Sequence, residues 1–183
     1  MRTLLIAPHA DDETLFAAYL AQRYAAHVAV VYDEGREQEL SLATTWLGCA
    51  YSQGGVRKGA SGDEVEALLI GLRDPSGADD WDLVLAPAVS EVGHEEHNLV
   101  GERCAVMFYD VPIIWYSTYA PRAHRMKGEE SFPEDPGHVA RKLAALSCYR
   151  SQIADPASGP WFYSLLDMRE WIAEEGWRPP PEC

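Results

Sequence analysis

The chain has 183 residues, of which 47% are hydrophobic and 24% are charged. This length and apolar fraction predict one compact domain with its own core and exclude a mainly disordered chain. Acidic residues outnumber basic ones 29 to 15, giving a net charge of −14, and the resulting repulsion argues against broad binding of nucleic acid or of an anionic membrane surface.

Short apolar runs predict buried β-strands at residues 3–7, 27–32, 83–88 and 111–116, with a shorter one at 49–51. The longer runs are rich in Val, Ile or Leu and do not alternate with polar residues, as expected of parallel strands covered on both faces. Apolar residues at helical spacing predict helices between and after these strands, over residues 15–22, 40–47, 65–72, 139–150 and 161–175. This alternation predicts an α/β fold: a Rossmann-like, open, mainly parallel sheet with helices on both faces.

Glycine and proline mark loops at residues 54–62, 121–137 and 155–160. No internal repeat or shift in composition marks a second domain. We therefore expect a single domain over residues 1–177, followed by a C-terminal tail at 178–183.

The cysteines and the hydrophobic runs indicate the compartment. The cysteines at 49, 104, 148 and 183 are far apart, which is typical of reduced thiols rather than of a disulfide framework. No apolar run approaches the ~18–20 residues of a membrane span, and the run after Arg2 is too short for a signal peptide. We expect a soluble, cytoplasmic protein; the sequence does not indicate an oligomeric state.

The first strand ends in Pro-His-Ala-Asp-Asp-Glu, at residues 8–13. In an open α/β sheet the ligand crevice lies beyond the carboxyl ends of the strands. A nucleotide site would place glycines there, whereas these three carboxylates would repel a phosphate and attract a cation. The alternative is an aspartate that only caps the next helix, but this explains one acid and leaves His9 beside Asp12 unexplained.

A second cluster, Ser-Glu-Val-Gly-His-Glu-Glu-His at residues 90–97, follows the strand at 83–88 and can reach the same crevice. Two histidines, a carboxylate and a water form a catalytic zinc set, although Fe(II) stays open as the metal. The histidine spacing does not fit HExxH, and a di-iron bundle would need a second Glu-x-x-His pair in an all-helical chain. A solvated or capping role is the alternative for His94 or His97 taken singly.

These segments resemble the PIG-L/LmbE-like zinc deacetylases, which remove an acetyl group from N-acetylglucosamine units on small glycosides or glycolipids. The family motif A-H-P-D-D-E is similar to residues 8–13, and H-P-D-H is similar to residues 94–97. Arg-x-x-Glu-x-x-x-Ala ending in Leu-Gly, within 36–48, and Lys-x-x-Ala followed by Tyr-Arg-Ser-Gln, within 142–152, resemble two further family segments. The resemblance runs from about residue 3 to residue 152 in the family order.

The resemblance implies that His9, Asp12 and His97 bind the zinc ion. It implies a general base at Asp11 and an electrophilic or general-acid histidine at His94. Fe²⁺ or another divalent ion could take the place of zinc.

The resemblance also implies that Arg36 contacts the substrate or shapes the site; a surface arginine is the alternative. Three positions depart from the family pattern. Ala10 and Glu95 replace prolines, and Glu96 replaces an aspartate that helps to hold the catalytic histidine in the family. The longer acid could still reach His94, with altered geometry.

The implied activity is metal-assisted hydrolysis of the acetyl amide of a small amino-sugar conjugate, in which zinc lowers the pKa of its bound water. The alternatives are deacylation of a non-sugar acylamide or modified nucleoside, and a non-catalytic metal- or glycan-binding relative. Trp115, Tyr116 and Tyr119 could stack on a sugar face or belong to ordinary packing.

Overall fold

The computed structural model describes residues 1–73, 81–119, 130–131, 135–153 and 175–178. These residues form a seven-stranded sheet in the order β3-β2-β1-β4-β5-β7-β6. The strands are β1 Thr3–Ala7, β2 His27–Asp33, β3 Ala50–Arg57, β4 Leu83–Pro87, β5 Ile113–Tyr116, β6 Glu130–Ser131 and β7 Gly176–Arg178. Strands β1 to β5 pair in parallel, and β7 runs antiparallel to β5 and β6.

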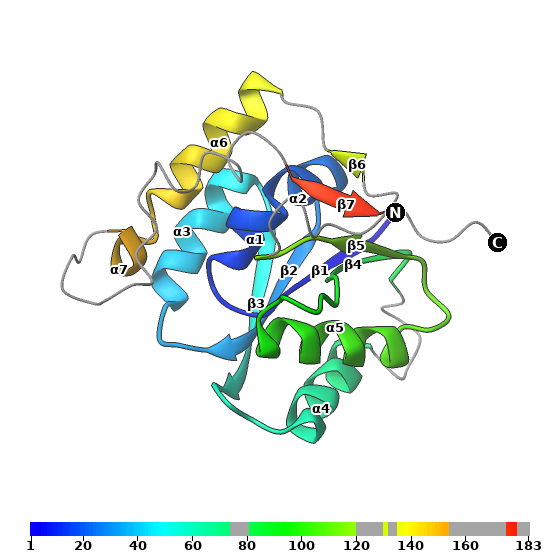
Figure 1. Ribbon diagram of the computed structural model, residues 1–183. Helices are drawn as coiled ribbons and strands as arrows, with labels where there is room; N and C mark the ends of the chain where they lie inside the picture. Colours follow the sequence, from blue (N-terminus) through cyan, green and yellow to red (C-terminus); the bar gives the residue numbers. More distant parts are fainter. Residues whose placement is uncertain (74–80, 120–129, 132–134, 154–174, 179–183) are drawn as a thin grey trace.

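Helices cover both faces of this sheet. They are α1 Asp12–Phe16, α2 Ala18–Tyr24, α3 Glu37–Leu47, α4 Gly62–Leu72, α5 Glu95–Met107, α6 Pro136–Leu146 and α7 Arg150–Ile153. Figure 1 shows α1, α2, α3 and α6 on one side of the sheet and α4 and α5 on the other. Along β1, Leu5 packs into the core on the side of α1, α2, α3 and α6, whereas Leu4 and Ile6 pack into the core on the side of α4 and α5. The predicted fold class, a single α/β domain with a mainly parallel sheet, is confirmed.

The strand predictions are right for β1 and differ at the ends of other strands. β5 begins at Ile113 rather than at residue 111, because Pro112 has no N–H to donate to the ladder. β3 runs over Ala50–Arg57, so the predicted strand at 49–51 was too short and the loop at 54–62 began too early. β3 lies at the sheet edge and buries only Val56, so it lacks an apolar run.

The helix predictions differ at several helix ends and at one internal break; α3 and α4 each begin three residues before the predicted 40 and 65. The helix expected over 15–22 is interrupted at Ala17, which has a φ of −139° and separates α1 from α2. α6 begins earlier than expected, at Pro136, because the Asp135 carboxylate accepts the N–H groups of Gly137 and His138. It ends at Leu146, before the expected residue 150.

The C-terminal expectations are tested only in part. The helix predicted at 161–175 falls outside the described residues up to 174, and so do residues 179–183 of the expected tail. Arg178, assigned to that tail, is the last residue of β7. Cys104 is buried, Cys49 and Cys148 are half-buried, and all three are free. None of the described helices is long and apolar enough to cross a membrane.

Helix α5 lies against the end of β4 at Gly101. A Cβ atom there would lie 2.5 Å from the carbonyl oxygen of Pro87, and the backbone cannot move aside as a side chain can. We expect Gly101→Ala to lower the free energy of unfolding by about 1–3 kcal/mol. Gly71→Ala, on α4 with nothing within 4 Å of its Cβ, should instead raise it by about 0.5–1 kcal/mol. Urea unfolding of both variants checks this, and equal effects would contradict the close approach.

Candidate active site

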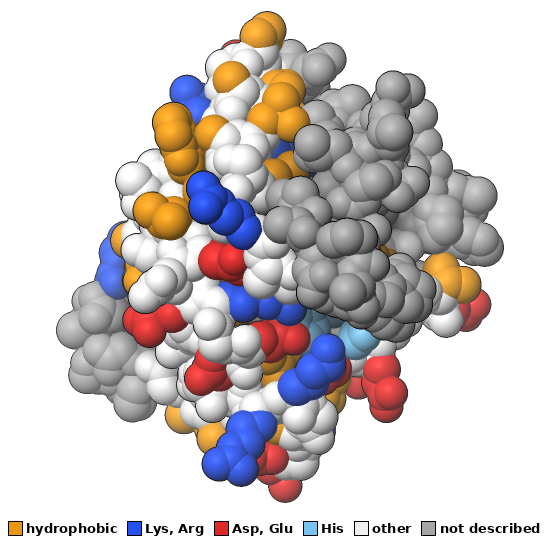
Figure 2. Space-filling model, turned by 90° about the vertical axis from the view of Figure 1, so that its left-hand side faces the viewer, with side chains coloured by type: hydrophobic (Ala, Val, Ile, Leu, Met, Phe, Trp, Pro, Cys, Tyr) orange, Lys and Arg blue, Asp and Glu red, His pale blue; other side chains and the backbone are white. Residues whose placement is uncertain are grey.

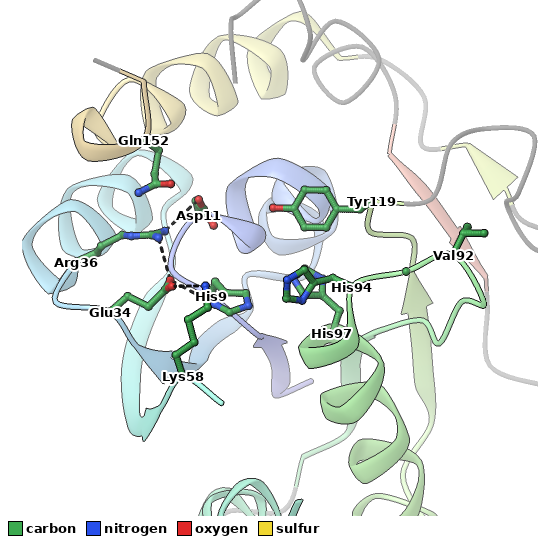
Figure 3. A pocket seen from close by; sticks show the side chains of 11 residues that line it. His9, Asp11, Glu34, Arg36, Lys58, Val92, His94, His97, Tyr119 and Gln152 are labelled. Atoms are coloured by element: carbon green, nitrogen blue, oxygen red, sulfur yellow. Dashed lines mark hydrogen bonds and ion pairs between the residues drawn. The ribbon is translucent and has the colours of Figure 1, made fainter. Parts of the chain in front are cut away.

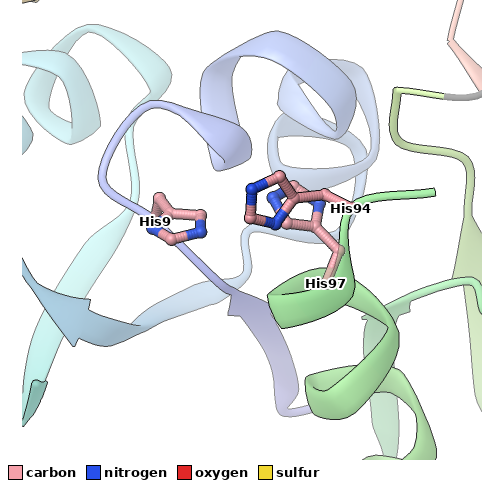
Figure 4. A group of neighbouring side chains, drawn as sticks. All are labelled: His9, His94 and His97. Atoms are coloured by element: carbon pink, nitrogen blue, oxygen red, sulfur yellow. The ribbon is translucent and has the colours of Figure 1, made fainter. Parts of the chain in front are cut away.

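Three histidines from two chain segments meet at the carboxyl edge of the parallel strands (Figure 4). His9 follows β1, His94 is the N-cap residue of α5, and His97 lies in the first turn of that helix. One ring nitrogen of each lies within 4.8 Å of those of the other two. The ring centroids of His9 and His97 are 5.3 Å apart. The structure therefore brings together the two segments that the sequence predicted to share an ion.

Asp12 lies beside His97 inside the protein. Neither side chain is exposed, and Oδ2 of Asp12 lies 3.1 Å from Nε2 of His97. The same Oδ2 accepts the backbone N–H of His9 at 2.8 Å. Oδ1 of Asp12 and Nδ1 of His97 have no hydrogen-bond partner among the described residues, and Nε2 of His97 has the Asp12 carboxylate as its neighbour without meeting hydrogen-bond geometry.

Buried polar atoms are seldom left without a partner. Imidazole nitrogens and carboxylate oxygens are the atoms that coordinate Zn²⁺, and they also suit other divalent transition metals. Because the unpartnered atoms of Asp12 and His97 lie beside the His9 ring, these residues fit a divalent metal ion. The fit rests on the chemical type of these atoms, imidazole nitrogen and carboxylate oxygen, and on their burial.

His94 is placed differently from His97. Its side chain is 37% exposed, and its Nδ1 accepts the backbone N–H of Glu96 at 3.3 Å, so His94 caps α5. The helix-capping role, which the sequence left as an alternative for His94, is therefore one of its contacts. Burial and the neighbouring His97 lower the pKa of His94, which favours the neutral imidazole in the metal-free site. His94 lies at the open side of the buried donor atoms.

Asp11 and Asp12 are neighbours in sequence with opposite pKa shifts. Burial and the Asp12 carboxylate raise the pKa of Asp11 well above its usual value, although Arg36 opposes them. Burial would also raise the pKa of Asp12, but His97 and His9 lower it below its usual value. Adjacent acids with separated pKa values are typical of sites where one carboxylate stays ionised and another takes part in proton transfer. Asp11 and Asp12 therefore differ in how readily each holds a proton.

Arg36 connects the backbone at Ala10 to the carboxylates of Asp11 and Glu34. Its Nη1 donates to the carbonyl oxygen of Ala10 at 2.7 Å and to Oδ2 of Asp11 at 3.1 Å. Its Nη2 lies 3.0 Å from Oε2 of Glu34. Arg36 is therefore no isolated surface arginine, and its role toward a substrate stays a prediction.

Glu34 is a site residue that the sequence analysis missed. Its Oε2 lies 3.3 Å from Nδ1 of His9, on the ring edge that faces away from His94 and His97 (Figure 3). Its Oε1 lies 3.6 Å from Nζ of Lys58, a second residue that was missed. Both residues directly follow strands, β2 and β3, so the rule that singled out residues 8–13 could have found them.

Glu96 contacts the site in a way that its position in the motif did not predict. Its Oε2 lies 3.3 Å from Nε2 of His9 but 3.9 Å from Nδ1 of His94. Its Oε1 accepts the backbone N–H of Gly59 at 2.9 Å. The longer side chain thus lies closer to His9 than to His94.

A cavity of about 690 Å³ opens at this site, and Glu34 and Lys58 are part of its wall (Figure 3). The predicted residues at its wall are His9, Asp11, Arg36, His94 and His97. Figure 2 shows acidic and basic side chains around the pale blue histidine surface on this face. Of the three aromatic residues singled out in the sequence, Tyr119 lines the cavity, whereas Tyr116 is fully buried and Trp115 packs against the core.

Neither a known protein-family model nor a curated protein sequence matches the chain. Two solved structures do share its fold. One is a triple mutant of a deacetylase involved in the teicoplanin biosynthetic pathway, with a TM-score of 0.78 and 17% identity, covering 98% of this chain and 97% of that one. The other is the N,N'-diacetylchitobiose deacetylase of Pyrococcus horikoshii in complex with its inhibitor MPG. It has a TM-score of 0.68 and 18% identity, covering 98% of this chain and 84% of that one.

At these identities the likeness establishes the fold. The chain therefore has the α/β fold of these two deacetylases over nearly its whole length.

Proposed function

We propose that the chain is a metal-dependent N-deacetylase of a small amino-sugar conjugate, with a divalent ion, zinc in the first place, held by His9, Asp12 and His97. The observation that carries this proposal is the set of buried, unpartnered donor atoms of Asp12 and His97 beside His9, at a cavity also lined by Asp11. The names of the two proteins that share the fold support amide deacetylation, and one of them acts on an acetylated amino sugar.

The protein residues divide the work of amide hydrolysis. A bound divalent metal supplies a Lewis acid and a water of lowered pKa. Asp11 accepts the proton of the attacking water, and Arg36 orients the Asp11 carboxylate through its 3.1 Å contact. His94, at the open side of the site, donates a hydrogen bond to the acyl oxygen as negative charge develops there. The amide C–N bond then breaks as its nitrogen takes up the proton that Asp11 accepted, and the products are the free amine and acetate.

Release of acetate from a panel of N-acetylated sugars tests the proposal. We expect turnover by the purified protein, loss of turnover after chelation, and recovery when zinc is restored, because Oδ1 of Asp12 and Nδ1 of His97 are buried without a hydrogen-bond partner among the described residues. Elemental analysis of the same samples should show about one metal ion per chain. Metal binding without turnover on any amide would instead indicate a non-catalytic relative.

A second candidate is deacylation of an acylamide other than a simple amino sugar. The structure with the higher TM-score and the more nearly complete coverage is a deacetylase of an antibiotic pathway. The substrate panel should therefore include N-acylated glycopeptides and modified nucleosides. Chelator-sensitive activity on these compounds alone would replace the amino-sugar assignment and retain the metal chemistry.

A further inference from the structure

The backbone of Asp11 is strained. Its φ is 140° and its ψ is −26°, a region that residues with a Cβ rarely adopt. Among the described residues other than glycine, only Ala25 also has a positive φ, and Ala25 lies in the ordinary left-handed region at the end of α2. A strained residue persists only where its surroundings hold it.

The side chain of Glu13 holds this conformation. It is completely buried, and its Oε2 accepts the backbone N–H of Asp11 at 3.0 Å. Its Oε1 accepts the hydroxyl groups of Tyr149 at 2.6 Å and of Thr14 at 2.5 Å. Both carboxylate oxygens are therefore occupied, and rotation of the carboxylate would break at least one of these bonds. Hydrogen bonds to a carboxylate are among the stronger ones in proteins, and three of them converge on this side chain.

Tyr149 belongs to a distant part of the chain that is itself anchored. It lies between α6 and α7, and 1% of its surface is exposed. Two residues later, Ser151 donates its backbone N–H and its hydroxyl to the Glu39 carboxylate, at 2.8 and 2.5 Å. Glu39 lies on α3, so the hydroxyl of Tyr149 is presented to Glu13 from a segment fixed to that helix.

We propose that Glu13 and Tyr149 are positioning residues that hold the strained Asp11 backbone and so aim its carboxylate into the cavity. The role of Asp11 in catalysis rests on the function proposed above, whereas the strain and its support do not. A displacement of about 1 Å of a catalytic group can cost on the order of 10²-fold in rate. Loss of the Tyr149 hydroxyl should therefore appear in kcat.

The first experiment compares Tyr149→Phe with Tyr116→Phe. Each variant removes one buried hydroxyl, and that of Tyr116 donates to the carbonyl oxygen of Ile6 at 2.7 Å, within the sheet. We expect similar falls in melting temperature for the two variants. Tyr149→Phe should lower kcat about 10–100-fold with unchanged KM and metal content, while Tyr116→Phe stays within about twofold of wild type. Unchanged kcat in Tyr149→Phe, or an equal loss in Tyr116→Phe, would overturn the proposal.

The second experiment measures the strain without any substrate. Glycine adopts the backbone angles of Asp11 freely and asparagine does not, so Asp11→Gly should melt about 2–4 °C above Asp11→Asn. A glycine variant no more stable than the asparagine variant would show that there is no strain for Glu13 to hold. Absence of acetate release from the wild-type protein would refute the proposed function instead, and this comparison would still decide whether Asp11 is strained.

Discussion

Replacing Asp11 by asparagine should lower the kcat of deacetylation about 10²–10⁴-fold without removing the metal. Asparagine has the size of aspartate and can still accept the hydrogen bond that Arg36 donates, but it cannot take a proton from water. The predicted metal ligands are untouched by the change. Steady-state kinetics together with elemental analysis of the same preparation measure both effects.

Two further variants show that the effect belongs to this carboxylate. His97→Ala removes a fully buried side chain of the proposed ligand set and should lose the metal itself. Glu102→Gln, on the exposed side of α5, removes a negative charge elsewhere and should keep both metal and turnover. Wild-type turnover in Asp11→Asn would mean that another group accepts the proton.

The sheet could be predicted from the sequence where burial alone decides the pattern. β1 and β4 are buried at every residue, so they appear in the sequence as continuous apolar runs. β3 could not be read in this way, because an edge strand exposes most of its residues and needs no apolar run. The break at Ala17 was also hidden, since the apolar spacing continues across it into α2.

The site was predictable to the extent that its residues are close together in the sequence. His9 and Asp12 lie in one segment and His94 and His97 in another, and the rule on strand ends places both segments at one crevice. Glu34 directly follows β2, where the same rule applies, and Tyr149 opens the Tyr-Arg-Ser-Gln segment of the resemblance, but neither position shows its contacts. Their contacts with His9 and Glu13 depend on how β2 and α6 pack, and no local pattern records this.

A buried ion pair completes the broken helix beside the site. In a continuous helix the N–H of Tyr19 would bond to the carbonyl oxygen of Leu15. Here Nζ of Lys142 donates to Leu15 at 2.8 Å, and Oε2 of Glu175 accepts from Tyr19 at 2.9 Å. Lys142 and Glu175 also bond to each other at 2.6 Å, and neither is exposed. The pair takes the place of the missing helix bond and connects α6 and the residue before β7 to α1 and α2.

Replacing Lys142 by methionine should lower the free energy of unfolding by about 3–5 kcal/mol. The change leaves the Glu175 carboxylate buried without a cation and the Leu15 carbonyl without its donor. Burial already raises the pKa of Glu175 above its usual value, against the opposing effect of Lys142, so loss of the lysine should raise it further. Urea unfolding at neutral pH measures the cost.

The pH dependence separates this cause from a simple loss of packing. An acid whose pKa is raised in the folded state takes up a proton on folding. A protein that contains such an acid therefore becomes more stable as the pH falls toward the acid's usual pKa. The deficit of Lys142→Met should therefore shrink as the pH falls from neutrality toward the ordinary glutamate pKa of about 4.3. Glu66→Gln, which breaks the exposed pair with Arg103 at 3.6 Å, should cost at most about 1 kcal/mol. A deficit in Lys142→Met that stays constant with pH would indicate lost packing around the methylene chain rather than an uncompensated Glu175 charge.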